Sequence, residues 1–252
     1  MGQSISIVIP VYNSSNSLPE LYQRLTNYLN PRFFSHEIVM VDDGSRDSSY
    51  KQMLALHRRD KRVKTISLDG NFGQQNALLC GLRYTRGEYI ITMDDDLQHY
   101  PEEIGKLISA AKEGYDVVYG IASKKHNLFY RNLGSKLTDR LFNLITPKST
   151  DIRVSSFRLI KRSLLEKIIE HEESFVYISA IILKYTDNIG NIQVEHGERK
   201  YGVSNYTFLK LLKLFLKIFI YYSGFPFLKY LRLQKPQYVI KDIQKGEPSS
   251  KS

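Results

Sequence analysis

Five short strand-like runs, separated by stretches with helical spacing, constrain the fold of this 252-residue chain most strongly. Each run has the length of a single strand and ends at a polar or turn-forming residue. The runs are Ser4–Val11, Glu37–Val41, Val63–Leu68, Glu88–Met93 and Asp116–Gly120. Helical spacing is found between them, at Leu18–Leu29, Asp47–Arg58, Gln74–Thr85 and from Pro101 onward. Strands alternating with helices predict an α/β fold whose central sheet is mostly parallel, with right-handed crossovers.

Polar loops follow three of the predicted strands. They are Tyr12-Asn13-Ser14, Asp42-Asp43-Gly44-Ser45 and Asp94-Asp95-Asp96. Ligands of such sheets bind beyond the carboxyl ends of the strands. Neighbouring carboxylates repel one another unless a cation lies between them, and Mg²⁺ or Mn²⁺ binds oxygen ligands that it often shares with substrate phosphates. One acidic loop alone is equally well explained as a solvated turn, but three polar loops at one sheet edge predict a metal-dependent site for a phosphate-bearing ligand.

Several other classes of site are disfavoured. No Gly-x-Gly-x-x-Gly sequence follows the first strand and no Walker A loop is present, so phosphates would be held by metal and side chains. Cys80 is the one cysteine, which excludes an internal disulfide framework and suits a reducing compartment. The N-terminus lacks a signal-peptide pattern, and we therefore expect a cytoplasmic protein.

The excess positive charge is concentrated near the C-terminus. Residues 199–241 hold nine of the 36 basic residues and no acidic residue, which leaves 27 basic against 26 acidic residues elsewhere. Lys210, Lys213 and Lys217 recur at helical spacing, and apolar residues lie between them. This basic amphipathic pattern predicts a helix at an anionic membrane surface, and it is a poor match to nucleic-acid stacking. A core-packing helix with a solvated lysine face remains an alternative. The uncharged run 218–228 is too short to span a bilayer.

Six motifs, taken together in this order, resemble those of inverting glycosyltransferases of family 2 with the GT-A fold. They are Ile9-Pro10-Val11-Tyr12-Asn13, Val41-Asp42-Asp43-Gly44-Ser45-Arg46-Asp47, Asn71-Phe72-Gly73-Gln74-Gln75-Asn76-Ala77, Asp94-Asp95-Asp96-Leu97-Gln98, Ser156-Phe157-Arg158-Leu159 and Gly202-Val203-Ser204-Asn205-Tyr206. The group that the chain resembles most is the polyprenyl-phosphate glycosyltransferases, which include dolichol-phosphate mannose synthase. Many of these relatives continue into C-terminal transmembrane helices, whereas this chain continues into a polar tail.

The resemblance implies a UDP-, GDP- or dTDP-linked sugar as donor and Mg²⁺ or Mn²⁺ as cofactor. Asp94 and Asp96 would form the Asp-x-Asp motif, with Asp96 as the first candidate for a metal ligand and Asp95 between them. Asp42 would bind the base of the nucleotide. The full set of donor-binding candidates is Pro10, Tyr12, Asn13, Asp42, Asp43, Gly73, Asp94 and Asp95.

The acceptor implied by the resemblance is a polyprenyl phosphate, either undecaprenyl or dolichyl. Many lipid-phosphate members carry an Asp directly before Phe-Arg-Leu, and here that position holds Ser156. A phosphate acceptor is already ionised at neutral pH and needs no general base, which fits this departure. Arg158 would act with Asp94 and Asp96 in catalysis by contacting phosphate, unless it forms a structural salt bridge. The candidates for acceptor and phosphate binding are Lys124, Lys125, Arg131, Ser156 and Arg158.

These observations predict a GT-A domain over residues 1–200, basic amphipathic helices at the membrane interface over 201–233, and a disordered polar tail over 234–252. The enzyme would act at the cytosolic face of the membrane as a peripheral protein. Its interfacial helices would suffice as an anchor, or a small membrane partner or a homo-oligomer would complete one. Two alternatives stay open: transfer to a hydroxyl of a lipid-linked or surface polysaccharide, and a non-catalytic protein that binds nucleotide sugars.

Overall fold

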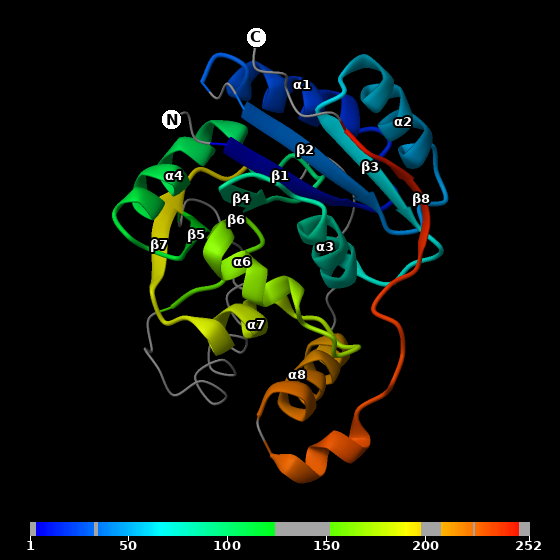
Figure 1. Ribbon diagram of the computed structural model, residues 1–252, viewed down its shortest axis with the longest axis vertical. Coiled ribbons are helices and arrows are strands. Elements are labelled where there is room, and N and C mark those ends of the chain that lie inside the picture. The colour runs from blue at the N-terminus through cyan, green and yellow to red at the C-terminus, as the bar shows by residue number, and fades with distance from the viewer. Residues whose placement is uncertain (1–3, 33–34, 124–151, 198–207, 224, 247–252) are drawn as a thin grey trace.

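An eight-stranded sheet forms the centre of the protein, with the strand order β7-β5-β6-β4-β1-β2-β3-β8 (Figure 1). The structure is a computed structural model that describes residues 4–32, 35–123, 152–197, 208–223 and 225–246. The strands are β1 (Ser4–Val11), β2 (Ser35–Asp42), β3 (Val63–Leu68), β4 (Tyr89–Thr92), β5 (Val117–Ala122), β6 (Arg158–Lys161), β7 (Ile189–Val194) and β8 (Ile240–Gln244). The strands β4, β1, β2 and β3 are parallel neighbours, while β6 and β8 run antiparallel to the strands beside them. The predicted α/β class is confirmed, and the ends of the five predicted strands shift by no more than two residues.

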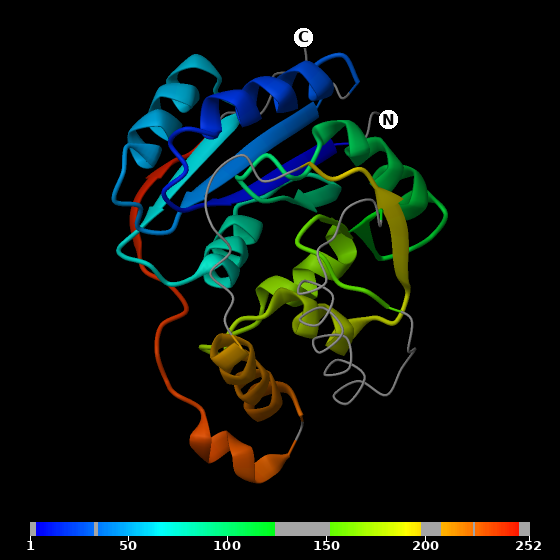
Figure 2. The ribbon, with the colours of Figure 1, turned by 180° about the vertical axis from the view of Figure 1, so that it is seen from behind.

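Helices cover both faces of the sheet (Figures 1 and 2). They are α1 (Leu18–Leu29), α2 (Ser49–Arg59), α3 (Gln74–Arg83), the 3₁₀ turn η1 (Pro101–Glu103), α4 (Ile104–Lys112), α6 (Arg162–Ile169), α7 (Ile178–Tyr185), α8 (Phe208–Tyr222) and the 3₁₀ turn η2 (Pro226–Leu231). The side chains of α1, α2 and α4 join one buried cluster, and those of α3, α6 and α7 join a second. In β1, Ile7 and Ile9 face the first cluster and Val8 faces the second, as the two-residue period of a strand requires. The sheet is therefore buried between two helical layers.

The register of the central strands brings three chain segments to one edge. Val11 pairs with Asp42 across β1 and β2, and Val8 pairs with Thr92 across β1 and β4. The backbone N–H of Met93 then donates to the carbonyl of Val8 (3.1 Å), which extends the β4 pairing toward the aspartates. The three polar loops predicted from the sequence consequently follow adjacent parallel strands.

A C-terminal arm, defined here as the described residues from Phe208 to Val239, extends below the sheet layers in both views (Figures 1 and 2). It consists of α8, η2 and an extended segment that leads back to β8. Within the described ranges, no helix is both long enough and apolar enough to cross a membrane. The predicted boundary between residues 200 and 201 falls outside the described residues and stays a prediction.

The prediction of disorder over 234–252 is wrong for part of that segment. Ile240–Gln244 forms β8, which pairs antiparallel with β3 at the edge of the sheet. Ile240 and Ile243 pack against the second buried cluster, and the Tyr50 hydroxyl donates to the Asp242 carboxylate (2.5 Å). The charged residues between these isoleucines conceal the strand in the sequence, because only two side chains of this edge strand are apolar anchors.

Candidate active site

Asp94 lies at the carboxyl end of β4 and receives hydrogen bonds from two distant segments. The Gln74 side-chain amide, at the start of α3, donates to Oδ1 (2.7 Å), and the Ser156 hydroxyl donates to Oδ2 (2.7 Å). Both donors leave further lone pairs on the carboxylate, since each carboxylate oxygen can accept more than one bond. Asp94 is thus held in one orientation and can still ligate a cation.

Asp95 connects the β4 loop to the β1 loop. Its Oδ2 accepts a hydrogen bond from the backbone N–H of Tyr12 (3.1 Å). Burial raises the pKa of Asp95 to about 6; hydrogen bonds from Ser14 and Tyr12 oppose the shift, and the carboxylates of Asp94 and Asp96 add to it. The raised pKa reflects negative charge packed in a partly buried place, which a cation at this edge would relieve.

Asp96 and Asp94 fit the oxygen chemistry of Mg²⁺ or Mn²⁺. Asp96 is half-buried, and its Oδ1 accepts the backbone N–H of Gln98 (3.1 Å). Within the part of the chain that the structure describes, no group of three or more His, Cys, Asp and Glu is placed to hold a metal ion. Two carboxylates leave coordination positions open for phosphate and water oxygens, as is usual for a cation that binds together with a phosphorylated substrate.

Asp42 and Asp43 end β2 in different environments. Asp42 is 3% exposed and accepts hydrogen bonds from the Ser45 N–H (3.2 Å) and the Ser67 hydroxyl (3.3 Å). Asp43 is 2% exposed, and its two oxygens accept the N–H groups of Phe72 (2.7 Å) and Gly73 (2.9 Å). Asp43 therefore holds the loop that precedes α3. If Asp43 affects binding of the nucleotide-sugar donor, it does so by positioning that loop.

Burial, with a smaller contribution from the neighbouring Asp42 carboxylate, raises the pKa of Asp43 to about 6, although the two backbone hydrogen bonds lower it. The loop that Asp43 holds also depends on glycine. Gly44 has a φ of +69°, and a Cβ there would lie 2.5 Å from the carbonyl carbon of Gly70. Only glycine combines this backbone conformation with such a close approach.

The β1 loop is fixed by the loop that follows β2. Asn13 adopts a φ of +52°; its N–H donates to the Ser45 hydroxyl (2.9 Å), and its Oδ1 accepts the N–H of Arg46 (2.8 Å). Tyr12 is 44% exposed at this edge, whereas Pro10 is buried inside β1. Tyr12 is consequently available to a ligand. Pro10 is buried and presents little surface to a ligand, so it can only help to position the loop that follows β1.

Arg158 lies beneath the aspartates and not at the surface. It is 2% exposed, its Nε donates to the Thr92 hydroxyl (3.1 Å), and one terminal nitrogen donates to the Ser179 hydroxyl (2.9 Å). Its guanidinium carbon lies 5.9 Å from the centre of the Tyr119 ring. In this conformation Arg158 supports the ends of β4 and β6, and it forms no salt bridge with a described carboxylate. Its predicted contact with phosphate stays a prediction.

His99 was not singled out from the sequence, yet it is central to the aspartate loop. It is 3% exposed, and its Nδ1 accepts the backbone N–H of Asp94 (2.9 Å). Its ring stacks on Phe157 (centroids 5.0 Å apart) and meets the edge of His196 (4.9 Å). Burial lowers the pKa of His99, the carboxylates of Asp94 and Asp96 raise it, and Arg158 lowers it. A neutral ring with its proton on Nε2 suits these contacts.

The same loop also pairs with residues 195–197. Gln98 and Gly197 exchange a backbone hydrogen bond (2.9 Å) and a side-chain hydrogen bond (3.3 Å), and His99 forms an isolated bridge with His196. The adjacent His196 drew no assignment from its position in the sequence. The only local signal was the Gln98-His99 pair, which follows the aspartates after Leu97, because the partners lie about a hundred residues away along the chain.

Lys124, Lys125 and Arg131 lie outside the described residues, so their contact with donor or acceptor phosphates stays a prediction. The Gly202–Tyr206 motif also lies outside them. The structure does bring together Tyr12, Asn13, Asp42, Asp94, Asp95, Asp96 and Ser156, with Gly73 bonded to Asp43 beside them.

Comparison with known proteins places these features in context. A family model described as Glycosyl transferase family 2 matches residues 6–169. Among solved structures, glucosyl-3-phosphoglycerate synthase from Mycobacterium tuberculosis with Mn²⁺, UDP and phosphoglyceric acid has a TM-score of 0.69 and 16% identity, covering 89% of this chain and 80% of that one. A further structure of that synthase has a TM-score of 0.68 and 17% identity, covering 93% and 88%. The same enzyme with Mn²⁺ and UDP-glucose has a TM-score of 0.64 and 16% identity, covering 87% and 77%. At these identities the structural likeness establishes the fold.

Proposed function

We propose that this chain, which belongs to glycosyl transferase family 2, transfers a sugar from a nucleotide-sugar donor to a polyprenyl phosphate with inversion at the anomeric carbon. It is a glycosyltransferase by family. The identity of the acceptor, the roles of single residues and a place at the cytosolic face of a membrane form our proposal.

The observation that carries the donor half is the meeting of three loops at one sheet edge. Asp42, exposed Tyr12 and the Asp94–Asp96 run follow three adjacent parallel strands. This arrangement offers a hydrogen-bond acceptor for a base, an aromatic surface, and carboxylates for a cation that neutralises a diphosphate. The solved structures of similar fold that contain Mn²⁺ with UDP or UDP-glucose support the same class of donor.

Asp94 and Asp96 would hold Mg²⁺ or Mn²⁺. When bound, the ion supplies Lewis-acid stabilisation of the leaving nucleoside diphosphate. The protein contributes orientation: Gln74 and Ser156 hold Asp94, and the Gln98 N–H holds Asp96. Asp95 accepts a hydrogen bond from the Tyr12 N–H and so connects the β1 loop to the same run. This bond fixes the candidate donor-binding groups relative to the candidate metal ligands.

The acceptor half rests on Ser156 and on the C-terminal arm. Transfer to a hydroxyl needs a general base near the anomeric carbon, and Ser156 supplies no carboxylate where many lipid-phosphate relatives carry an Asp. Its hydroxyl is already committed to Asp94. An acceptor that is ionised at neutral pH removes that need. The basic arm then provides a surface for the anionic membrane in which a polyprenyl phosphate resides.

A second candidate is a small phosphorylated acceptor with a free hydroxyl. The synthase structures that contain phosphoglyceric acid favour it, since their fold spans most of this chain. At 16% identity that likeness does not carry an acceptor from one protein to the other. The two acceptors predict different products, and a transfer assay separates them.

The test begins with a donor screen by thermal unfolding, using UDP-, GDP- and dTDP-sugars with Mn²⁺. A donor at a hundred times its Kd should stabilise the folded protein by about 2.7 kcal/mol. The selected donor is then incubated with undecaprenyl phosphate, with the matched alcohol undecaprenol, and with 3-phosphoglycerate. We expect transfer to the phosphate alone. Transfer to undecaprenol or 3-phosphoglycerate but not to undecaprenyl phosphate would refute the proposed acceptor, and donor binding without turnover on any acceptor would support a non-catalytic protein.

A further inference from the structure

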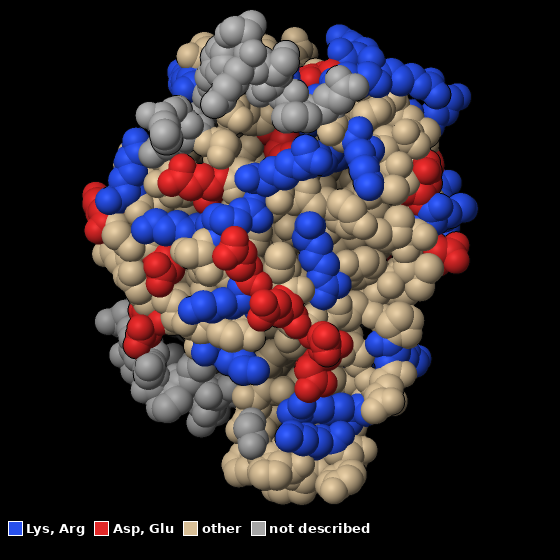
Figure 3. All heavy atoms as spheres, in the orientation of Figure 1, with Lys and Arg blue, Asp and Glu red and all other residues tan. Residues whose placement is uncertain are grey.

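The end of the C-terminal arm exposes an unusual amount of apolar surface. Its large side chains are exposed by 48% (Phe225), 64% (Phe227), 93% (Tyr230), 62% (Leu231) and 63% (Leu233). We call these five residues the apolar tip. In Figure 3 the lower end of the molecule, where η2 lies, shows uncharged side chains, whereas charged side chains cover much of the face above it. Exposed apolar surface of this kind marks a site that contacts a membrane or another protein.

The tip is an ordered structure with its own packing. Leu228 of η2 and Ile218 of α8 are buried, at 6% and 2% exposure. The rings of Phe219 and Phe225 lie 5.9 Å apart, and those of Phe225 and Phe227 lie 5.7 Å apart. One side of η2 therefore packs on α8, and the other side presents the apolar tip outward.

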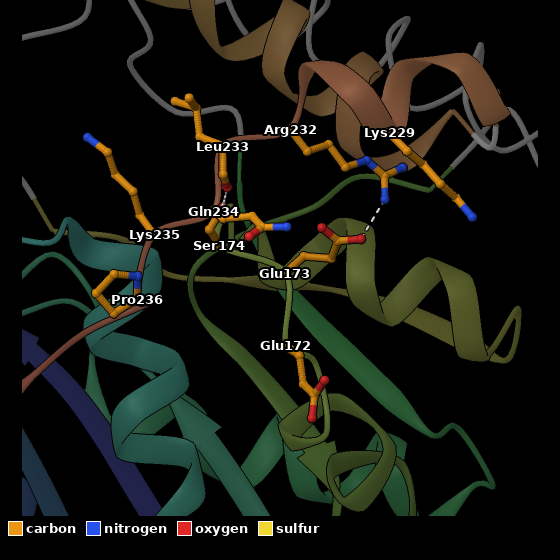
Figure 4. A pocket seen from close by; sticks show the side chains of 9 residues that line it. All are labelled: Glu172, Glu173, Ser174, Lys229, Arg232, Leu233, Gln234, Lys235 and Pro236. Carbon is orange, nitrogen blue, oxygen red and sulfur yellow. Dashed lines mark hydrogen bonds and ion pairs between the residues drawn. The ribbon is translucent and has the colours of Figure 1, made fainter.

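Basic residues accompany the tip in the sequence. Residues 225–241 contain Lys229, Arg232 and Lys235, with Lys241 farther along on β8, and no acidic residue. Figure 4 shows Arg232 reaching the Glu173 carboxylate (2.5 Å), while the side chains of Lys229 and Lys235 extend away from that ion pair. An apolar surface with the lysines Lys229 and Lys235 near it suits the boundary between the acyl chains and the headgroups of an anionic bilayer.

Lys217 on α8 has a different orientation from the tip. The ammonium nitrogen of Lys217 lies 5.5 Å from the centre of the Phe175 ring, which belongs to the segment between α6 and α7. Lys217 is thus directed toward the catalytic part of the protein. Leu216 and Phe219, which are exposed by 50% and 36%, extend the apolar surface of the tip along α8. The surface best suited to lipid is the apolar one.

The arm is tied to the catalytic part at several points. The Gln237 amide donates to the carbonyl of His171 (2.7 Å), Arg83 donates to the Tyr238 hydroxyl (2.8 Å), and β8 completes the sheet edge. The Tyr222 hydroxyl donates to the carbonyl of Phe175 (2.9 Å). A tip held in lipid would consequently restrict the orientation of the whole sheet.

From these contacts we infer that the apolar tip inserts into the headgroup and acyl boundary of an anionic bilayer and orients the enzyme toward a lipid-borne acceptor. This inference rests on the proposed function for its biological use, but insertion itself is measured without turnover. A second copy of the chain is the competing occupant of the same surface, and the experiment separates the two.

The chain has no tryptophan, so a single introduced tryptophan reports its own surroundings. Tyr230→Trp places the probe at the most exposed position of the tip, and Tyr115→Trp, at a position 36% exposed before β5, is the matched control. With vesicles of phosphatidylglycerol and bromine-labelled phosphatidylcholine, we expect a blue shift and quenching for Y230W and neither for Y115W. Unchanged Y230W emission on protein that sediments with the vesicles would overturn the inference. A blue shift without lipid, with a doubled mass by light scattering, would assign the tip to self-association and overturn it too.

A second variant separates insertion from catalysis. Phe227→Ser with Leu231→Ser should lower transfer to undecaprenyl phosphate in vesicles on the order of tenfold or more, since two exposed apolar side chains no longer leave water. Transfer to a short, water-soluble prenyl phosphate should be unchanged. An equal loss with both acceptors would mean that the tip acts on the active site, which contradicts insertion. If the unaltered chain uses neither acceptor, the proposed function fails, and the fluorescence still decides insertion.

Discussion

The carboxyl edge of the sheet and the C-terminal arm differ in which side chains they bury. The edge withdraws charged groups from water, whereas the arm leaves apolar groups exposed to it. At the carboxyl edge, Asp42, Asp43 and Asp95 are largely withdrawn from water and held by backbone or hydroxyl donors. In the arm, the side chains of Phe227 and Leu231 remain in water, although both are apolar. Negative charge gathered at one place calls for a cation or a ligand, and apolar surface left exposed at another calls for an apolar phase.

The two regions also differ in how they are held. The carboxyl edge is assembled from loops that follow strands in perfect register, so each loop is fixed on both sides. The arm is joined to the rest by side-chain hydrogen bonds, by the Arg232–Glu173 ion pair and by β8. We therefore expect changes at the edge to alter turnover and changes in the arm to alter where turnover takes place.

The largest expected effect comes from Asp96→Asn at the carboxyl edge. Loss of one carboxylate from the candidate metal site should reduce the transfer rate by roughly a thousandfold, because charge that develops on the leaving diphosphate loses its neutralisation. The half-saturating concentration of Mn²⁺ should rise as well. Initial rates of product formation across a Mn²⁺ titration measure both effects.

Asp69→Asn is the matched control for this change. Asp69 is an exposed carboxylate just after β3, and its backbone N–H, not its side chain, bonds to the carbonyl of Val239. The control removes the same charge near the same sheet edge and should leave the rate within about twofold, as surface changes generally do. A D96N enzyme as fast as D69N would show that the aspartate run does not hold the metal.

Much of the fold was predictable because its central strands carry strong local signals. Ser4–Val11 and Val63–Leu68 were placed with the observed ends, since each is a short segment rich in β-branched residues. The antiparallel strand β6 (Arg158–Lys161) was not predicted, because four residues with charged ends carry little strand periodicity. The edge strand β8 was missed for a similar reason, and only its pairing with β3 makes it a strand.

The candidate site was predictable to the level of its loops but not of its contacts. Asp42 and Asp94 were expected at one edge, and the strand register places them there. The bonds from Gln74 and Ser156 to Asp94, and the stacking of His99 on Phe157, join segments 20 to 62 residues apart. No periodicity in a single sequence encodes such pairs. The burial of Arg158 likewise depends on Thr92 and Ser179, which come from other elements.

An intermediate effect should come from reversing the lysine charges of α8. Lys210, Lys213 and Lys217 all changed to Glu should weaken binding to anionic vesicles on the order of a hundredfold at low salt, since a lysine near an anionic surface contributes about 1 kcal/mol and a glutamate in its place is repelled. Donor binding should be unchanged. Vesicle co-sedimentation across a salt series measures the loss, which should shrink as salt screens the charges.

Lys51, Lys61 and Lys112, all exposed on the catalytic part, provide a matched set of three charge reversals. If total charge alone attracts the protein to lipid, these three reversals should weaken vesicle binding as much as the α8 reversals do. That result would contradict a special role of the arm in membrane binding. Unchanged binding with the α8 variant would mean that its lysines form a solvated face. The apolar tip would then carry the membrane contact alone.

The smallest expected effect is a pH dependence that belongs to the carboxyl edge. Burial raises the pKa of Asp43 from 3.8 to about 6, so the folded state binds a proton more tightly than the unfolded state does. Such a group adds to the unfolding free energy fully at pH values below its pKa in the unfolded state. That contribution is lost as pH rises toward its pKa in the folded state. Between pH 4 and 6 the metal-free protein should lose roughly 2 kcal/mol of unfolding free energy through this group.

Asp43→Asn isolates this contribution. The amide does not titrate, so the difference in unfolding free energy between wild type and variant should narrow as pH rises from 4 to about 6. The variant loses one acceptor for the N–H groups of Phe72 and Gly73, which lowers stability at every pH and does not alter that trend. Urea unfolding at several pH values without metal measures the difference. A pH-independent difference would mean that Asp43 keeps an ordinary pKa. Ionisation of this buried carboxylate would then destabilise the folded protein less than its burial implies.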